Sequence, residues 1–255
     1  MIDIHCHILP NVDDGPKDIE LSVDMARHAV DEGITTIIAT PHHNDSYRNV
    51  KNDILDKVLL LNNILLQKNI PLNILPGQET RIYGEMIEDY DKNEILTLNN
   101  TGKYLFVELP SNHVPRYTEQ LLFDTQLKGL TPIIVHPERN QEIIENPDKL
   151  YHFVKKGALT QVTASSVCGH FGKKIKRFSL QLIESNLTHF IASDAHNLSG
   201  RSFRMREAYG VMEKEFGMNG VYLFQENAEL LVENKTVFKE IPERVKKKKI
   251  LGIFG

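Results

Sequence analysis

Short apolar runs, separated by longer stretches of mixed character, form the main pattern of this chain. Seven such runs occur, and many of their residues are β-branched, as in Thr36-Ile37-Ile38-Ala39. Together with their polar ends they cover residues 3–7, 36–42, 73–79, 104–108, 132–139, 159–163 and 189–196. Runs of this length and composition predict strands that are buried on both faces of a parallel sheet.

The stretches between the runs have the periodicity of helices. Residues 17–32, for example, follow Pro16 and end before Gly33, which are residues typical of the start and the end of a helix. Further helices are predicted at 51–69, 117–128, 147–156 and 173–186, and two more at about 202–216 and 226–233. This alternation predicts an α/β fold, a distorted seven-stranded (βα)7 TIM-like barrel with right-handed crossovers.

Length and composition indicate one domain over residues 1–255. The 255 residues are close to the ~250 of one such barrel, and the hydrophobic content of 41% is ordinary for a globular protein. A polar motif begins at residue 3, which leaves no room for a signal peptide, and no run is long enough to span a membrane. The two cysteines, Cys6 and Cys168, fit a reducing environment, so we expect a cytoplasmic protein. The net charge of −4 gives no indication of nucleic-acid binding.

Six of the runs end in residues that can bind a metal ion. His5 and His7 are two positions apart, so on a strand their side chains point the same way and that of Cys6 points the opposite way. The other candidates at strand ends are His42, Glu79, Glu108, His136, Asp194 and His196, and Asp14 follows in the loop after the first strand. Imidazole and carboxylate together suit Mn, Fe or Zn better than Ca or Mg. This number of ligands suits two or three ions, with Glu79 in a position to bridge them.

The motifs resemble a known family. The stretches Asp3-Ile4-His5-Cys6-His7 with Asp13-Asp14-Gly15, Ala39-Thr40-Pro41-His42, Gly77-Gln78-Glu79, Glu108-Leu109-Pro110, His136-Pro137-Glu138-Arg139 and Ser193-Asp194-Ala195-His196 are similar to those of the polymerase-and-histidinol-phosphatase (PHP) phosphoesterases. Within that superfamily, the chain resembles the manganese-dependent protein-tyrosine phosphatases of Gram-positive capsule and exopolysaccharide operons. The matching stretches run through residues 1–206, which is most of the chain.

The resemblance implies a ligand set for each ion and two residues that bind phosphate. It implies a first ion at His5, His7, Glu79 and Asp194, a second at Glu79, Glu108 and His136, and a third at His42, His196 and Asp14. Carboxylates stand at Glu108 and Asp14 where the superfamily often has histidine, which favours Mn or Fe over Zn. Arg139 and Arg206 resemble the family's phosphate-binding arginines, and Arg201 and Arg204 are weaker candidates.

The implied reaction is hydrolysis of a phosphotyrosine monoester by water that the metals activate. The cysteines do not support a thiol mechanism, because the residues six positions after them are Val12 and Lys174 rather than the arginine of a Cys-x5-Arg loop. Rival interpretations remain open: a histidinol-phosphate phosphatase or other phosphoesterase or nuclease of the superfamily, or a metal-binding regulatory module without turnover.

The expected partner is the tyrosine-phosphorylated tail of a bacterial kinase that controls capsule or exopolysaccharide synthesis. The basic tail at about 244–255 includes the run Lys246-Lys247-Lys248-Lys249. Such a run is most often a solvated end, although it could also contact a membrane surface or an acidic kinase tail.

Overall fold

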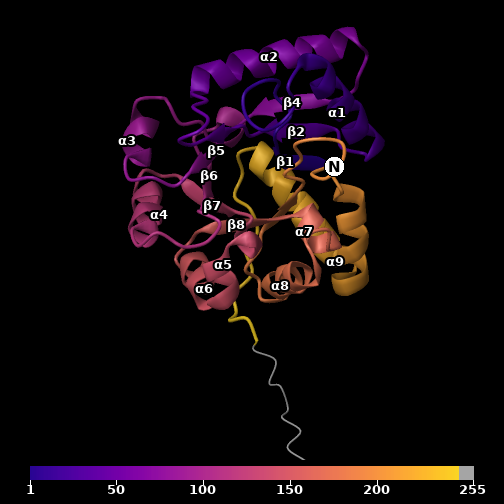
Figure 1. Cartoon of the computed structure of the whole chain (residues 1–255). Helices are drawn as coiled ribbons and strands as arrows, with labels where there is room; N and C mark the ends of the chain where they lie inside the picture. Colours follow the sequence, from indigo (N-terminus) through magenta and orange to yellow (C-terminus); the bar gives the residue numbers. More distant parts are fainter. Residues whose placement is uncertain (247–255) are drawn as a thin grey trace, which may run out of the picture.

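The computed structural model describes residues 1–246, so Lys247–Lys249 of the basic tail lie outside the described residues. Helices surround a core of strands (Figure 1). The strands are β1 (Ile2–Cys6), β2 (Thr36–Ala39), β3 (His42–His43), β4 (Asn73–Pro76), β5 (Glu79–Arg81), β6 (Tyr104–Glu108), β7 (Thr131–Val135), β8 (Leu159–Thr163) and β9 (Phe190–Ala192). The helices are α1 (Ile19–Asp31), α2 (Lys51–Gln67), α3 (Met86–Asp91), α4 (Thr118–Leu127), α5 (Gln141–Glu145), α6 (Asp148–Lys155), α7 (Ala164–Cys168), α8 (Lys173–Glu184) and α9 (Met205–Val232). There are also two 3₁₀ helices in the described residues, η1 (Leu98–Asn100) between α3 and β6 and η2 (Pro137–Arg139) after β7.

The strands pair in parallel in two sheets, with the orders β1-β2-β4 and β3-β5-β6-β7-β8-β9. β2 and β3 come from a single predicted run, as do β4 and β5, and each run is interrupted where it passes from one sheet to the other. The ring closes between β1 and the end of β9 through a parallel bridge between Cys6 and Ala195. Asp194 N also donates to His5 O at 2.8 Å, which joins the same two segments. The result is the predicted distorted barrel of seven strand positions.

Two apolar clusters hold the barrel together. The larger one lies between strands and helices and includes Cys6, Leu105 and Val107. The smaller one includes Ile4, Phe106 and Ile133, whose side chains point the opposite way from their strand neighbours, together with Leu231 of α9 and Val237. Tyr104 is the first residue of β6, and its Oη donates a hydrogen bond to Lys235 O in the segment after α9. The end of α9 and the segment after it therefore cover the N-terminal ends of the strands. The C-terminal ends of the strands are left uncovered by this segment, and this is the end at which the functional sites of βα barrels lie.

The predicted helices agree with the observed ones within a few residues, with one exception at the C-terminus. The two helices predicted at 202–216 and 226–233 correspond to the two parts of α9 (Met205–Val232), which is broken at Gly217 with φ 72° and ψ 176°. The first part ends as predicted, and the second part begins several residues earlier than predicted. The short helices α3, α5 and α7 were not predicted, because five or six residues are too few for a helical period to be recognised.

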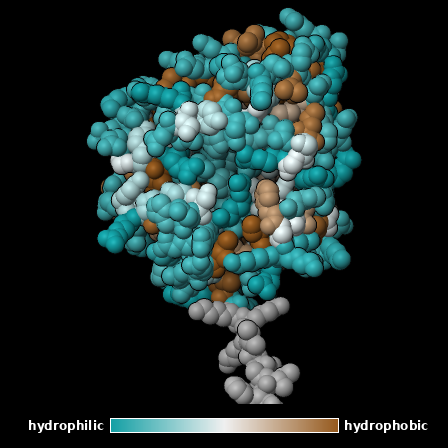
Figure 2. Space-filling model, viewed as in Figure 1, coloured by the Kyte–Doolittle hydropathy of each residue, from teal (hydrophilic) through white to brown (hydrophobic). Residues whose placement is uncertain are grey.

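The outer surface is mostly hydrophilic on the face shown in Figure 2, and apolar side chains gather over α2. Leu59, Leu60 and Leu66 of this helix are exposed. No helix in residues 1–246 has the length and apolar character needed to cross a membrane.

Gly77 lies at the interruption between β4 and β5, where there is no space for a side chain. A Cβ there would lie 2.6 Å from Ile38 Cγ2 and 3.0 Å from Leu98 Cδ2. We expect Gly77→Ala to lower the free energy of unfolding by about 1–3 kcal/mol through overpacking. Gly84→Ala is the control, because nothing lies within 4 Å of its added Cβ, and it should change stability by less than about 0.5 kcal/mol. Urea unfolding at fixed metal concentration measures both, and equal stabilities would contradict the expectation.

Candidate metal centre

His5 of β1 and His7, which follows directly after the end of that strand, both point into the barrel mouth, as the alternation of side chains along an extended chain requires. His5 and His7 are fully buried, and their Nε2 atoms lie 3.3 Å apart. Cys6 points away from them into the larger apolar cluster, where its thiol contacts Ala195 O at 3.6 Å. Burial raises the pKa of the Cys6 thiol well above its ordinary value.

Glu79, the first residue of β5, is the centre of the site. Its buried carboxylate is surrounded by imidazoles: Oε2 lies 3.4 Å from His5 Nε2, 3.1 Å from His7 Nε2 and 2.8 Å from His42 Nδ1. Its other oxygen, Oε1, lies 2.8 Å from His136 Nε2. Burial alone would raise the pKa of Glu79, but the charges of His42 and His5 outweigh it and hold the pKa well below its usual range.

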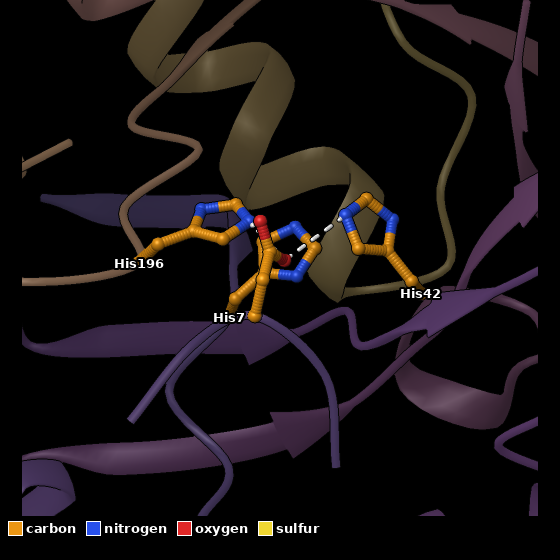
Figure 3. A group of neighbouring side chains, drawn as sticks. His7, His42 and His196 are labelled. Carbon is orange, nitrogen blue, oxygen red and sulfur yellow. Dashed lines mark ion pairs between the residues drawn. The ribbon is translucent and has the colours of Figure 1, made fainter. Parts of the chain in front are cut away.

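Around this carboxylate, potential ligand atoms form three overlapping groups, each with all its atoms within 4.8 Å of one another. The groups are His5, His7, Glu79 and Asp194; His42, Glu79 and Glu108; and His7, Asp14, His42 and His196. Figure 3 shows the rings of His7, His42 and His196 directed toward one another. The first and third groups contain all the residues expected for the first and third ions. In the second, His42 rather than His136 lies with the two glutamates.

Several ligand atoms in these groups are buried and have no hydrogen-bond partner among the described residues. They are His42 Nδ1, Glu79 Oε2, Glu108 Oε2 and His196 Nε2. Oppositely charged groups do lie close to these atoms, with His42 Nδ1 2.8 Å from Glu79 Oε2 and Arg81 Nε 2.9 Å from Glu108 Oε2, but neither contact has the geometry of a hydrogen bond. Unpartnered polar atoms are costly inside a protein, and a divalent cation would satisfy these. Nitrogen and carboxylate oxygen together fit Mn, Fe or Zn.

Other residues orient the imidazoles from behind. His7 Nδ1 lies 2.7 Å from Asp13 Oδ2, and the same oxygen accepts from the backbone N–H of His42 at 3.1 Å. His5 Nδ1 contacts Gln161 Oε1 at 2.8 Å. Such contacts direct the opposite ring nitrogen toward the cluster. The sequence did not indicate these roles: Asp13 entered only as part of the Asp13-Asp14-Gly15 motif, and Gln161 is the middle residue of β8.

Asp14 reaches the cluster from the loop after β1. Its Oδ1 lies 3.1 Å from His196 Nε2 and 3.4 Å from His42 Nε2, and 43% of its side chain is exposed. The contacts with His196 and His42 lower the pKa of Asp14 below its ordinary value. Asp14 is therefore the ligand candidate that is most open to solvent.

Two of the candidate arginines lie at the cluster. Arg139 Nη1 donates to Asp194 Oδ2 at 2.6 Å. Arg201, the weaker candidate, donates Nη1 to Asp14 Oδ2 at 2.9 Å and lies 3.4 Å from Asp194. Arg81 was not expected, yet its Nε lies 2.9 Å from Glu108 Oε2. The only signal for it was its position two residues after Glu79 on the same strand, which places both side chains on one face.

Arg206 lies elsewhere in this structure. Its Nη2 donates to Asp31 O at 2.6 Å, at the end of α1, and its backbone N–H donates to Glu32. Arg204 faces Glu207 at 3.9 Å. The predicted phosphate contact of Arg206 therefore has no support from its position, and Arg201 is the arginine that accompanies Arg139.

Comparisons with known proteins agree with this site. The family model for capsular polysaccharide synthesis, CpsB/CapC, matches residues 1–233. Tyrosine-protein phosphatase YwqE of Bacillus subtilis (strain 168) is 55% identical over 255 residues, 100% of both chains. Tyrosine-protein phosphatase CpsB of Streptococcus agalactiae serotype III (strain NEM316) is 32% identical over 92% of this chain and 99% of its own length.

A solved structure extends the likeness to three dimensions. It comes from crystal structures of YwqE from Bacillus subtilis and CpsB from Streptococcus pneumoniae, described as metal-dependent tyrosine phosphatases. Its TM-score is 0.94 at 55% identity, and the match covers 97% of this chain and 100% of that chain. The resemblance inferred from the motifs is thus confirmed, and this chain belongs to the CpsB/CapC family of capsular polysaccharide synthesis.

Proposed function

We propose that this protein is a metal-dependent tyrosine-protein phosphatase that acts in capsular polysaccharide synthesis. One observation carries the proposal: the buried Glu79 carboxylate contacts four imidazoles and is shared by two of three overlapping ligand groups. Arginine side chains lie beside these groups, as recognition of a phosphate dianion requires. The family and the relatives named as tyrosine-protein phosphatases support the same activity.

The proposal assigns the ligand groups to two or three Mn²⁺ ions, with Fe or Zn as alternatives. One ion would be held by His5, His7, Glu79 and Asp194, one by Glu79 and Glu108 with His42 or His136, and one by Asp14, His42 and His196. Bound ions of this kind lower the pKa of water and neutralise charge on a transferred phosphoryl group.

Arg139 and Arg201 are proposed to bind the phosphate. Within residues 1–246 the Arg139 guanidinium makes one hydrogen bond, from Nη1 to Asp194, which fixes its position and leaves its other N–H donors free. Arg201 Nε is buried and has no hydrogen-bond partner in the described part of the chain. A planar guanidinium with free donors can pair with two phosphate oxygens at once. Together these residues orient the ester with its phosphate toward the ligand groups.

A thiol mechanism receives no support from the two cysteines. Cys6 is packed in the apolar core behind the cluster. Cys168 lies 3.9 Å from Arg204 O, and burial raises the pKa of its thiol to about 12. Both thiols are therefore protonated near neutral pH, and a protonated thiol is a poor nucleophile.

We further propose that the substrate is the tyrosine-phosphorylated tail of a bacterial kinase in the capsule pathway. Phosphotyrosine holds its phosphate about 3 Å farther from the backbone than phosphoserine, as ordinary covalent dimensions imply. All members of the ligand groups except Asp14 and His42 are buried, so a longer side chain reaches them more easily. A nuclease would require a basic surface to bind the phosphate backbone, and the net charge of −4 does not indicate one.

A substrate panel in the presence of Mn²⁺ tests the activity directly. It compares a phosphotyrosine peptide, the same peptide with phosphoserine, histidinol phosphate and single-stranded DNA. We expect the highest kcat/KM for the phosphotyrosine peptide. A preference for histidinol phosphate or DNA would contradict the tyrosine assignment. No hydrolysis of any substrate by protein with measured bound metal would identify a non-catalytic metal-binding module instead.

The arginines give a second prediction. Arg139→Ala should lower kcat/KM roughly a hundredfold, because a charged contact to the transferred phosphate is often worth ~3 kcal/mol. Metal content by elemental analysis should stay unchanged. Arg27→Ala, at an exposed position on α1, is the matched control and should have no effect.

The same assay separates Arg201 from Arg206. From their positions, Arg201→Ala should lower kcat/KM by more than about tenfold, whereas Arg206→Ala should change it by less than about threefold. If Arg206→Ala lowered kcat/KM as much as Arg139→Ala does, Arg206 would be a phosphate-binding residue and its exclusion from the site would be wrong.

A further inference from the structure

Two aromatic side chains lie beside the metal centre and belong to neither apolar cluster of the fold. Tyr47 and Phe171 are both half-buried, and neither is among the residues that form or pack against the two clusters. Each instead faces a residue of the site. The Phe171 ring centroid lies 5.3 Å from Cζ of Arg139, and the Tyr47 ring is stacked on His42 with centroids 6.1 Å apart and an angle of 15° between the planes.

The loop after β3 holds Tyr47 in place. Asn44 Oδ1 accepts from the backbone N–H groups of Ser46 and Tyr47, and Asn44 N donates to Tyr47 O at 2.8 Å. An antiparallel bridge between His43 and Arg48 closes the loop. The Tyr47 hydroxyl makes no hydrogen bond to any residue in 1–246, so no polar contact of its own accounts for this position of the ring.

Phe171 stands on the opposite part of the ring of strands, in the connection between α7 and α8. Gly169 and Gly172 on either side of it have φ angles of 97° and 95°, which glycine adopts without strain. These two positions let the chain turn tightly and place an apolar ring next to the charged Arg139. A half-exposed phenyl group at such a place adds little to the stability of the core.

We propose that Tyr47 and Phe171 form an aromatic rim that binds the phenyl ring of the substrate's phosphotyrosine. When Arg139 and Arg201 hold the phosphate, the ring of an aryl ester lies farther out, near the entrance to the site. Phe171 beside Arg139 and Tyr47 beside His42 are placed to contact it there. Offset or edge-to-face contacts between aromatic rings then stabilise the aryl ester. An alkyl ester such as phosphoserine has no ring to make them. This inference rests on the proposed function and assigns its selectivity to two residues.

The test uses leucine to remove each ring while keeping an apolar side chain. Tyr47→Leu and Phe171→Leu are compared with Tyr47→Phe and Phe171→Tyr, which keep an aromatic ring. Tyr222→Leu and Phe123→Leu are the matched controls, at aromatic positions that are 57% and 54% exposed on α9 and α4. For each metal-loaded variant, kcat/KM is measured with a phosphotyrosine peptide and its phosphoserine counterpart. Dissociation constants of phenylphosphonate and methylphosphonate are measured by calorimetry.

We expect each leucine variant at the rim to weaken phenylphosphonate binding by roughly three- to tenfold, the range that stacking of one aromatic pair gives. The preference for phosphotyrosine over phosphoserine should fall by the same factor, while methylphosphonate binding changes by less than about twofold. The variants that keep a ring should retain the preference for phosphotyrosine over phosphoserine, and both matched controls should behave as the unaltered protein.

Other outcomes would contradict the proposal that these two rings bind the substrate. An equal loss with both phosphonates would mean that Phe171 only positions Arg139, and unchanged constants would mean that the rings do not contact the ligand. If the unaltered protein cleaves no phosphotyrosine peptide, the proposed function itself fails. If the unaltered protein prefers phosphotyrosine and the leucine variants keep that preference in full, only the aromatic rim fails.

Discussion

The burial of one carboxylate among four imidazoles is the constraint on which the site depends. Glu79 is fully buried, and a buried ionised carboxylate is costly unless opposite charge surrounds it. The compensation comes from segments far apart in the sequence, since His5 and His7 belong to the first strand position, His42 to β3 and His136 to the end of β7. In this structure the closed ring of strands brings these ends within 3.4 Å of one carboxylate. The stability of the buried Glu79 carboxylate therefore depends on the closure of the barrel.

The irregular parts of the barrel position several of the side chains that meet at this site. The runs that hold His42 and Glu79 each pass from one sheet to the other, and Gly77 packs against Ile38 and Leu98 at that interruption. Two candidate ligands, His136 and Asp194, have left-handed backbone conformations with φ of 35° and 54°. Such conformations are uncommon for residues other than glycine and are concentrated at functional sites. The distortion of the barrel thus coincides with the placement of its ligands.

The sequence predicted those features that depend on local periodicity. Alternation along β1 and the residue after it was enough to place His5 and His7 together and Cys6 opposite. The ends of parallel strands were enough to group the remaining candidate ligands. Features that depend on how distant segments pack were not accessible. The position of Arg206 against α1 is one example, and the place of His42 with Glu79 and Glu108 is another. Asp13 and Gln161 act through a histidine ring, and no spacing in the sequence indicates such a contact.

The most direct measurement is anomalous diffraction at the manganese absorption edge, from crystals of this protein grown with Mn²⁺. If Glu79 organises the site, the map will contain two or three peaks within ligand distance of the three groups, and two of the peaks will share Glu79. Glu79→Gln, which keeps the shape of the side chain and removes its charge, will lose those two peaks together. A single ion that does not contact Glu79, or peaks that are unchanged in Glu79→Gln, would contradict the account.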